Sequence, residues 1–243
     1  LRLGLADEDM ANADGIKRKL ITDALRDYQV LLRMTTEYAE GFNDLLDVFG
    51  ITLIPVEGQP IMRLVALQDT EYENMGLILG HLDFVSVSDD PTEEKTSDDT
   101  YYRIGLREFV RRIEVLKEWQ DLDGFKTFMD LFGFQITSKD KTWVRAIALQ
   151  ENKDKAYADM GLVFGQLDFI GEDESATGDK RITPVEFSRR MDVLTDLVND
   201  PQNRFEEVFM PLFGITAKEG SETLMRRIAL NDEISQEEVY ANM

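Results

Sequence analysis

The 243-residue sequence contains no cysteine, one histidine, six prolines and no long apolar run. Without cysteine, disulfides, thiolate nucleophiles and cysteine-ligated metal sites are excluded. The one histidine, His81, has Gln166 as its counterpart in the repeat described below, so acid–base or metal-ligand chemistry is not expected there. No stretch of about eighteen apolar residues exists, so the sequence predicts no membrane-spanning helix. No catalytic residue, cofactor or metal site is therefore predicted.

Basic residues are scarce beside acidic ones. There are 48 Asp and Glu against 27 Lys and Arg, a formal net charge of −21. Such a surface repels nucleic acid and anionic lipid, because both are bound through cationic groups. Three interpretations stay open: solubility, adaptation to high salt, or a surface for a basic partner. With no cysteine and no signal-peptide pattern, we expect a cytoplasmic protein.

The sequence repeats itself about every eighty residues. Three Phe-Gly pairs are each followed, at similar distance, by an Arg-x-φ-Ala-Leu segment, where φ is apolar. The pairs are Phe49-Gly50, Phe132-Gly133 and Phe213-Gly214, and the segments begin at Arg63, Arg145 and Arg226. Three matching anchors predict tandem copies of one structural unit.

The flanks of these anchors repeat as well. A Tyr-x-x-Met-Gly helix begins at Tyr72 and again at Tyr157, and an Arg-Ile…Glu-Phe helix follows each; residues 22–34 are a degraded version of the latter. The last four residues, 240–243, match the start of the Tyr-x-x-Met helix. We therefore predict a partial first repeat over 1–71, a second over 72–153, a third over 154–236 and the start of a further copy over 237–243.

Each unit is predicted to run helix, linker, short strand, helix, helix, strand, loop, strand. The first helices cover 73–85 and 156–170, and the linkers 86–100 and 171–180 are rich in Ser, Thr, Asp, Glu and Gly. Thr183, followed by Pro184 and by Glu186, has the pattern of a helix N-cap. Each Arg-x-φ-Ala-Leu segment is predicted to be the second strand of a β-hairpin. The predicted fold class is α+β, mostly helical with small hairpins.

This order of elements resembles a winged-helix domain, and tandem copies are similar to the accessory subunits of bacterial condensins, paired winged helices bound to a kleisin. The resemblance implies an exposed recognition helix and a β-hairpin wing that are free for partners. A DNA-reading winged helix presents basic residues there. Here the recognition helices are acidic, and the wings at 55–60, 138–142 and 218–222 carry no basic cluster. Direct nucleic-acid binding is therefore not expected.

Two further patterns carry weaker signals. The stretch from Asp168 to Glu186 faintly resembles a calcium loop, but it is too long and out of register for an EF-hand. Glycine pairs one turn apart lack the strand and Lys of a phosphate cradle, so we expect close helix packing there. These glycines are Gly76, Gly80, Gly161 and Gly165.

The repeat and the missing catalytic groups favour a non-enzymatic adaptor that binds a protein partner, basic or part of a larger complex. The alternative is a DNA mimic that blocks a nucleic-acid-binding protein with its carboxylates. A membrane partner is not expected. The predicted partner-binding residues lie in or beside the three recognition helices: Asp44, Asp47, Asp130, Glu206 and Glu207.

Overall fold

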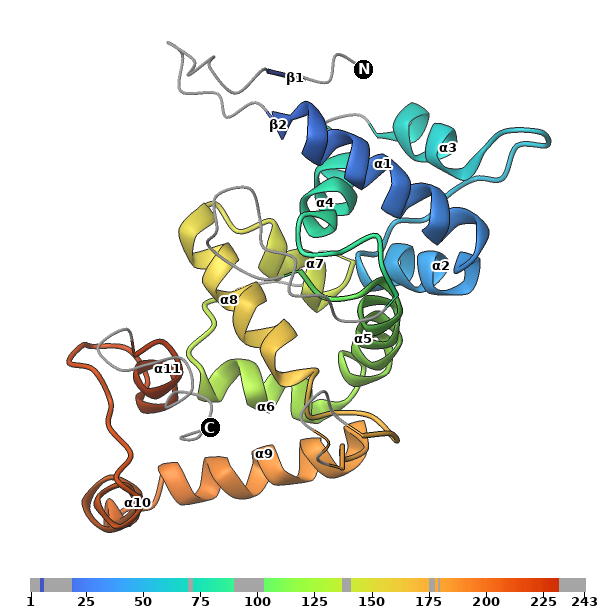
Figure 1. The fold of residues 1–243 in the computed structure, drawn as a ribbon. Coiled ribbons are helices and arrows are strands. Elements are labelled where there is room, and N and C mark those ends of the chain that lie inside the picture. The colour runs from blue at the N-terminus through green and yellow to red at the C-terminus, as the bar shows by residue number, and fades with distance from the viewer. Residues whose placement is uncertain are drawn as a thin grey trace. The chain divides into compact units, whose positions relative to one another are not determined.

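The computed structural model describes residues 5–6, 19–69, 72–89, 103–136, 141–174, 178 and 180–231. They belong to two compact units, Leu1–Glu114 and Val115–Met243. Within the described residues nearly all regular structure is helical (Figure 1). Strand pairing in this part of the chain is limited to β1 and β2, two residues each, and to three isolated bridges.

The first unit begins with β1 (Leu5–Ala6) paired in parallel with β2 (Lys19–Leu20). Four helices follow: α1 (Ile21–Thr36), α2 (Ala39–Val48), α3 (Ile61–Gln68) and α4 (Glu73–Leu82). Helix α5 (Leu106–Trp119) starts in this unit and ends in the next. Apolar side chains such as Val30, Met34 and Phe42 are buried between the helices, so each helix is stabilised mainly by its packing.

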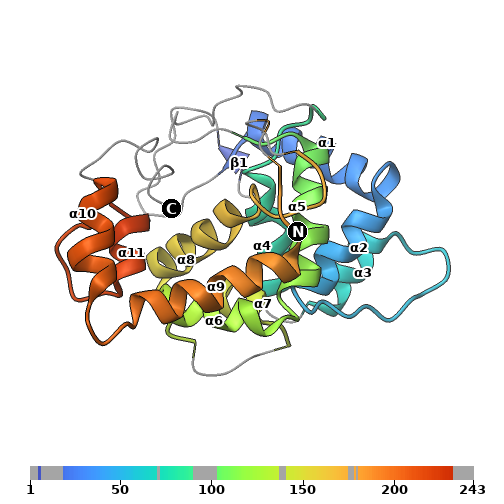
Figure 2. The ribbon, with the colours of Figure 1, turned by 90° about the horizontal axis from the view of Figure 1, so that it is seen from below.

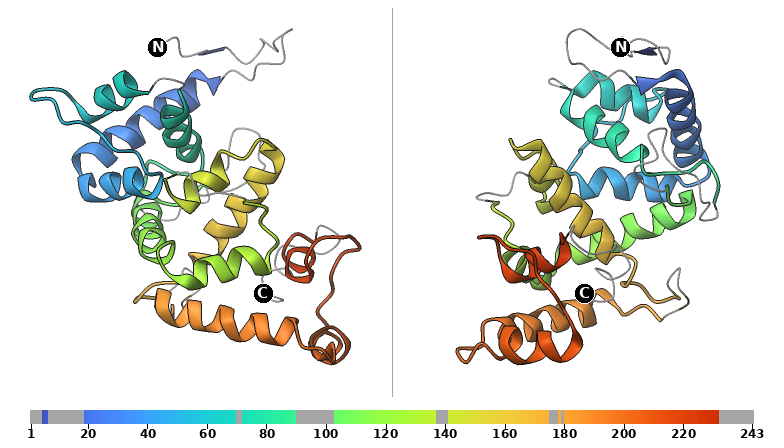
Figure 3. Two further views of the ribbon diagram at one scale, coloured as in Figure 1. Left: turned by 180° about the vertical axis from the view of Figure 1, so that it is seen from behind. Right: turned by 60° about the vertical axis from the view of Figure 1, so that its left-hand side comes forward.

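The second unit continues with α6 (Asp123–Leu131), α7 (Trp143–Ala148), α8 (Lys153–Gln166), α9 (Pro184–Val198), the π-helix η1 (Phe205–Phe209), α10 (Met210–Phe213) and α11 (Leu224–Ala229). Helices α6 and α9 run side by side (Figure 2). Helix α7 packs beside α8 (Figure 3). Trp119 is fully buried in this unit, with its ring centroid 4.8–5.1 Å from the rings of Phe125, Phe128 and Phe187.

The predicted α+β fold with winged-helix hairpins is wrong. The three Arg-x-φ-Ala-Leu segments form the helices α3, α7 and α11, and the described parts of the three predicted wings are loops. A Thr N-cap explains two of these helices: Thr142 accepts a hydrogen bond from the backbone N of Arg145, and Thr223 accepts one from Arg226. With a capped start, the Arg, Ala, Leu and Met of these segments follow their helical preference.

The link between the first two helices of a repeat has the same geometry twice. Val85 bridges in parallel to Ile104, and Ile170 bridges to Ile182. The short strands were predicted at Ile104 and Ile182, whereas the predicted helices 73–85 and 156–170 were too long, because α4 ends at Leu82 and α8 at Gln166. Just before each bridge, an arginine Nε donates to a backbone carbonyl: Arg103 to Asp83 at 3.1 Å and Arg181 to Asp168 at 2.9 Å. The repeat in the sequence is therefore a repeat of local structure, although its predicted domain boundaries stay a prediction.

The helices after these links carry a repeated ion-pair cluster. Glu108 accepts from Arg111 and Arg112, at 2.7–2.8 Å. Glu186 does the same with the next two arginines, Arg189 and Arg190, at 2.8–2.9 Å. Burial raises the pKa of Glu108, but the two arginines outweigh it and lower this pKa to about 2.

Close helix packing occurs at glycines other than those predicted. A Cβ on Gly41 would lie 2.4 Å from Val110, and one on Gly124 would lie 2.1 Å from Ser188. Gly41 and Gly124 each stand directly before the first Phe of a recognition-position helix. Val110 and Ser188 each stand directly after the Phe of the Glu-Phe helix in the next repeat. A Cβ on any of the four predicted glycines would meet no heavy atom within 4 Å, so that prediction was wrong.

Candidate docking groove on the first unit

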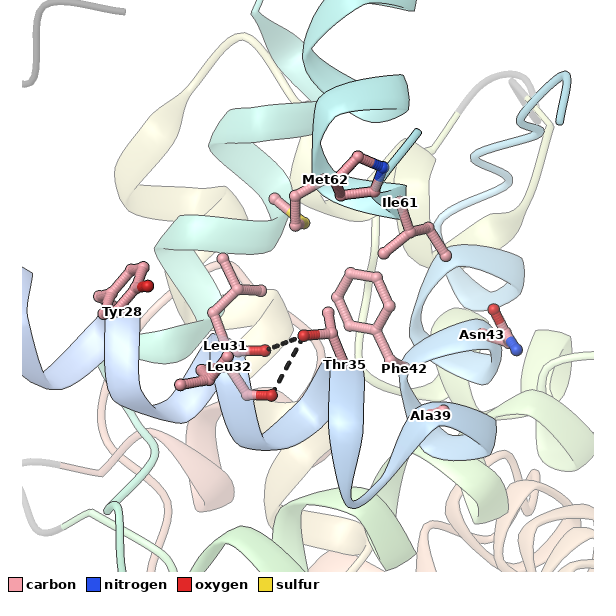
Figure 4. Close-up of a pocket in the computed structure, with 10 residues that line it drawn as sticks. Tyr28, Leu31, Leu32, Thr35, Ala39, Phe42, Asn43, Ile61 and Met62 are labelled. Atoms are coloured by element: carbon pink, nitrogen blue, oxygen red, sulfur yellow. Dashed lines mark hydrogen bonds between the residues drawn. The ribbon is translucent and has the colours of Figure 1, made fainter. Parts of the chain in front are cut away.

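Helices α1, α2 and α3 of the first unit surround an open groove of about 530 Å³ (Figure 4). Its lining is mainly apolar and includes Leu31, Leu32, Phe42, Ile61 and Met62. The Thr35 hydroxyl in its wall donates to the carbonyls of Leu31 and Leu32, so it is satisfied within α1. A groove with this lining favours apolar side chains over a polar ligand.

Helix α1 supplies the groove because it has two apolar faces. Val30 and Met34 are fully buried against the rest of the unit. Leu25, Tyr28 and Leu32, spaced three and four residues apart, are 58%, 63% and 49% exposed. A stripe of large apolar side chains on the solvent side of a packed helix is typical of an interaction surface.

A second hollow of about 530 Å³ is lined by α2, α3 and the segment between them. Leu46, Ile51 and Leu64 line it together with Asp47, and it shares Asn43 and Ile61 with the first groove. The shared residues show that the two hollows are neighbours.

Helix α2 carries three carboxylates, of which Asp47 lines the second hollow. Glu40 and Asp47 are exposed, and Asp44 is half-buried. The pKa of Glu114 on α5 is raised by burial and by the negative charges of Asp44 and Glu40, so these carboxylates crowd one another. A cationic partner placed beside them would relieve this repulsion.

The predicted partner-binding residues fall on both units. Asp44 and Asp47 lie on α2, where Asp47 borders the second hollow. Asp130 is exposed on α6, while Glu206 and Glu207 are exposed on η1, with Glu206 3.9 Å from Arg227. Of the five, the structure thus places Asp47 alone at one of the two hollows, and Leu25, Tyr28 and Leu32 were missed. Their signal was present, because α1 has more apolar residues than one buried face requires.

The other sequence candidates serve packing and ion pairing. His81 donates from Nδ1 to the Leu77 carbonyl at 2.6 Å, and its ring lies 4.7 Å from Phe49; burial lowers its pKa. In the stretch that resembled a calcium loop, Arg181 pairs with the carboxylates of Asp168 and Asp173. The described residues contain no group of three or more His, Asp or Glu placed to hold a metal ion.

Comparison with known proteins gives no relative. No protein-family model, no curated protein and no solved structure matches the chain. Among the helices of the described residues, none combines the length and the apolar character needed to cross a membrane. Functional inference therefore depends on the groove itself.

Proposed function

We propose that the protein is a non-enzymatic adaptor whose first unit binds an amphipathic helix of a basic partner protein. The observation that carries this proposal is the exposed stripe of Leu25, Tyr28 and Leu32 beside an apolar groove, next to a second hollow that Asp47 borders. The apolar face of the partner helix would lie in the groove, and its Lys and Arg would face α2.

A helix fits this groove because helices are recognised through apolar anchors at positions i, i+3, i+4 and i+7. The stripe on α1 has that spacing, so two such helices can interdigitate side chains along their length. Apolar contact supplies most of the affinity.

Asp47 and the nearby Asp44 of α2 would select the charge of the partner. Opposite charges steer the encounter of two proteins and raise the association rate, whereas like charges oppose it. The net charge of −21 acts in the same sense over longer distances. A DNA mimic would use the same carboxylates but would not need the groove, so the two proposals differ in their dependence on Leu32.

Two synthetic helical peptides of about eighteen residues, long enough to form five turns, test the proposal. They carry Leu at the same i, i+3/i+4, i+7 positions, and one has Lys while the other has Glu on the outer face. Fluorescence anisotropy is expected to show saturable binding of the Lys peptide, weakened by salt, and much weaker binding of the Glu peptide. Leu32→Asp should reduce the affinity for the Lys peptide about tenfold or more, as truncation of a central apolar anchor does.

Charge reversal on α2 should change the association rate rather than the strength of the apolar contact. Asp44→Lys with Asp47→Lys is expected to slow association and reduce its salt dependence. The same double reversal at Glu206 and Glu207 measures how far the third repeat takes part. Val193→Asp, at an exposed apolar site on α9, is the matched control for Leu32→Asp.

Two outcomes would contradict the adaptor proposal. One is equal binding of the Lys and Glu peptides. The other is Lys-peptide binding that needs Asp44 and Asp47 but ignores Leu32→Asp, which would favour the mimic.

A further inference from the structure

The third Phe-Gly pair differs from the first two in its exposure. Phe49 and Phe132 are buried, and so are the residues before them, Val48 and Leu131. At the same positions of the third repeat, Leu212 is 75% and Phe213 63% exposed. Two adjacent large apolar side chains in a position that the other repeats bury indicate a surface that lacks its usual cover.

The first repeat shows what that cover is. Phe49 packs against the ring of His81 on α4, the Tyr-x-x-Met-Gly helix that opens the next repeat. In the second unit, α8 is the corresponding opening helix, and it packs beside α7, the last helix of the second repeat. In both repeats the opening helix of the next repeat thus packs on the closing helix, α4 beside α3 and α8 beside α7, and in the first repeat it also contacts the Phe of the Phe-Gly pair.

A complete further repeat would not fit the third one in the same way. Gly41 and Gly124 allow the Glu-Phe helix of the next repeat to approach within contact of the backbone. Their counterpart in the third repeat is Arg204, whose side chain is exposed and paired with Asp200. A side chain of this size cannot occupy a position where a single Cβ would lie 2.1–2.4 Å from the neighbouring helix.

The π-helix keeps the Phe side chains of the third ending in the arrangement that they have in the second repeat. Phe205 and Phe213 are eight residues apart, against seven for Phe42–Phe49 and Phe125–Phe132, and η1 accommodates the added residue. Phe209 still stacks between Phe205 and Phe213, with centroids 5.2 and 4.5 Å away, as Phe128 lies between Phe125 and Phe132. The row of three Phe rings that ends at the Phe-Gly pair of the second repeat is thus retained in the third.

We propose that Leu212 and Phe213 form a docking site for one helix with the sequence pattern of α4 and α8, and not for a complete further repeat. Val208, on η1 just before α10, is also exposed and belongs to the proposed site. This site is independent of the groove on the first unit.

A labelled peptide that spans residues 153–170, the α8 helix with its last turn, is the probe, and it is added to the whole 243-residue chain. Saturable binding is expected, and Leu212→Asp with Phe213→Asp should weaken it at least tenfold without lowering the unfolding midpoint, because both side chains are exposed. Val193→Asp, and Leu32→Asp in the first unit, should leave the affinity unchanged. Loss of binding with Leu32→Asp alone would place the peptide in the groove and overturn this proposal.

A second peptide, residues 184–198, carries the α9 helix. It is expected not to bind, because the Arg204 side chain lies where this helix would have to contact the backbone. Equal binding of the two peptides, or α8-peptide binding that ignores Leu212→Asp with Phe213→Asp, would overturn the proposal. Sedimentation equilibrium of the protein and of its Phe213→Asp variant measures whether the chain forms dimers through this face. A dimer that dissociates with Phe213→Asp would mean that a second copy of the chain covers the face, which also overturns it.

Discussion

The second and third repeats end differently, although both endings lie in the second unit. In the second, α6 runs as a regular helix into Phe132-Gly133, with Gly124 tight against α9. In the third, η1 and α10 carry one more residue, Arg204 replaces the glycine, and Leu212 and Phe213 are exposed. Both end at a glycine with φ 68°, so the local C-cap is the same. The same motif thus forms a core in one repeat and a surface in the other, depending on whether a helix covers it.

The largest effect is expected from the paired substitutions Phe132→Ala and Phe213→Ala. Phe132 is buried, so its truncation should lower the free energy of unfolding by about 3–5 kcal/mol. Phe213 is mostly exposed, and its truncation should change that free energy by less than about 1 kcal/mol. Urea denaturation of both variants checks this, and similar losses would show that the third ending is covered after all.

A smaller but still clear loss in the free energy of unfolding is expected from substitution of Gly124. Gly124→Ala places a Cβ within 2.5 Å of the Ser188 backbone, so the helices must separate, at about 1–3 kcal/mol. Arg204→Ala at the matching position removes only an exposed pair with Asp200 and should leave the unfolding midpoint unchanged. A Gly124→Ala protein as stable as the unsubstituted one would contradict the close approach of α6 and α9.

The smallest effect concerns His81, the residue that covers Phe49. Because burial lowers the pKa of His81, the unfolded chain binds its proton more readily, and the free energy of unfolding should fall as pH drops below about 6.5. One proton limits this slope to about 1.4 kcal/mol per pH unit. His81→Gln copies Gln166 of the next repeat and should flatten the slope between pH 7 and 5. An unchanged slope would mean that His81 does not contribute to it.

The repeat and its local chemistry could be predicted from the sequence. Thr183 accepts from the backbone of Glu186 as an N-cap, Gly133 ends its helix with positive φ, and Arg189 and Arg190 pair with Glu186. These features depend on residues within four positions of one another, so the sequence contains all the information that they need.

Features that depend on tertiary packing were not predictable in this way. The segment around Arg226 was assigned to a strand, but its arginine pairs with the buried Asp159 of α8 and its apolar side chains fill one helical face. The exposed faces at Leu32 and Phe213 consist of the same residue types as the core. Only the arrangement of neighbouring helices distinguishes a covered Phe from an uncovered one.

Methyl NMR of the protein during titration with the Lys-faced peptide would show which side chains form the docking site. We expect shifts concentrated on Leu25, Leu31, Leu32, Ile61 and Met62, and their loss with Leu32→Asp. Shifts confined to other regions, or none at saturating peptide, would contradict the assignment of the groove on the first unit as the docking site.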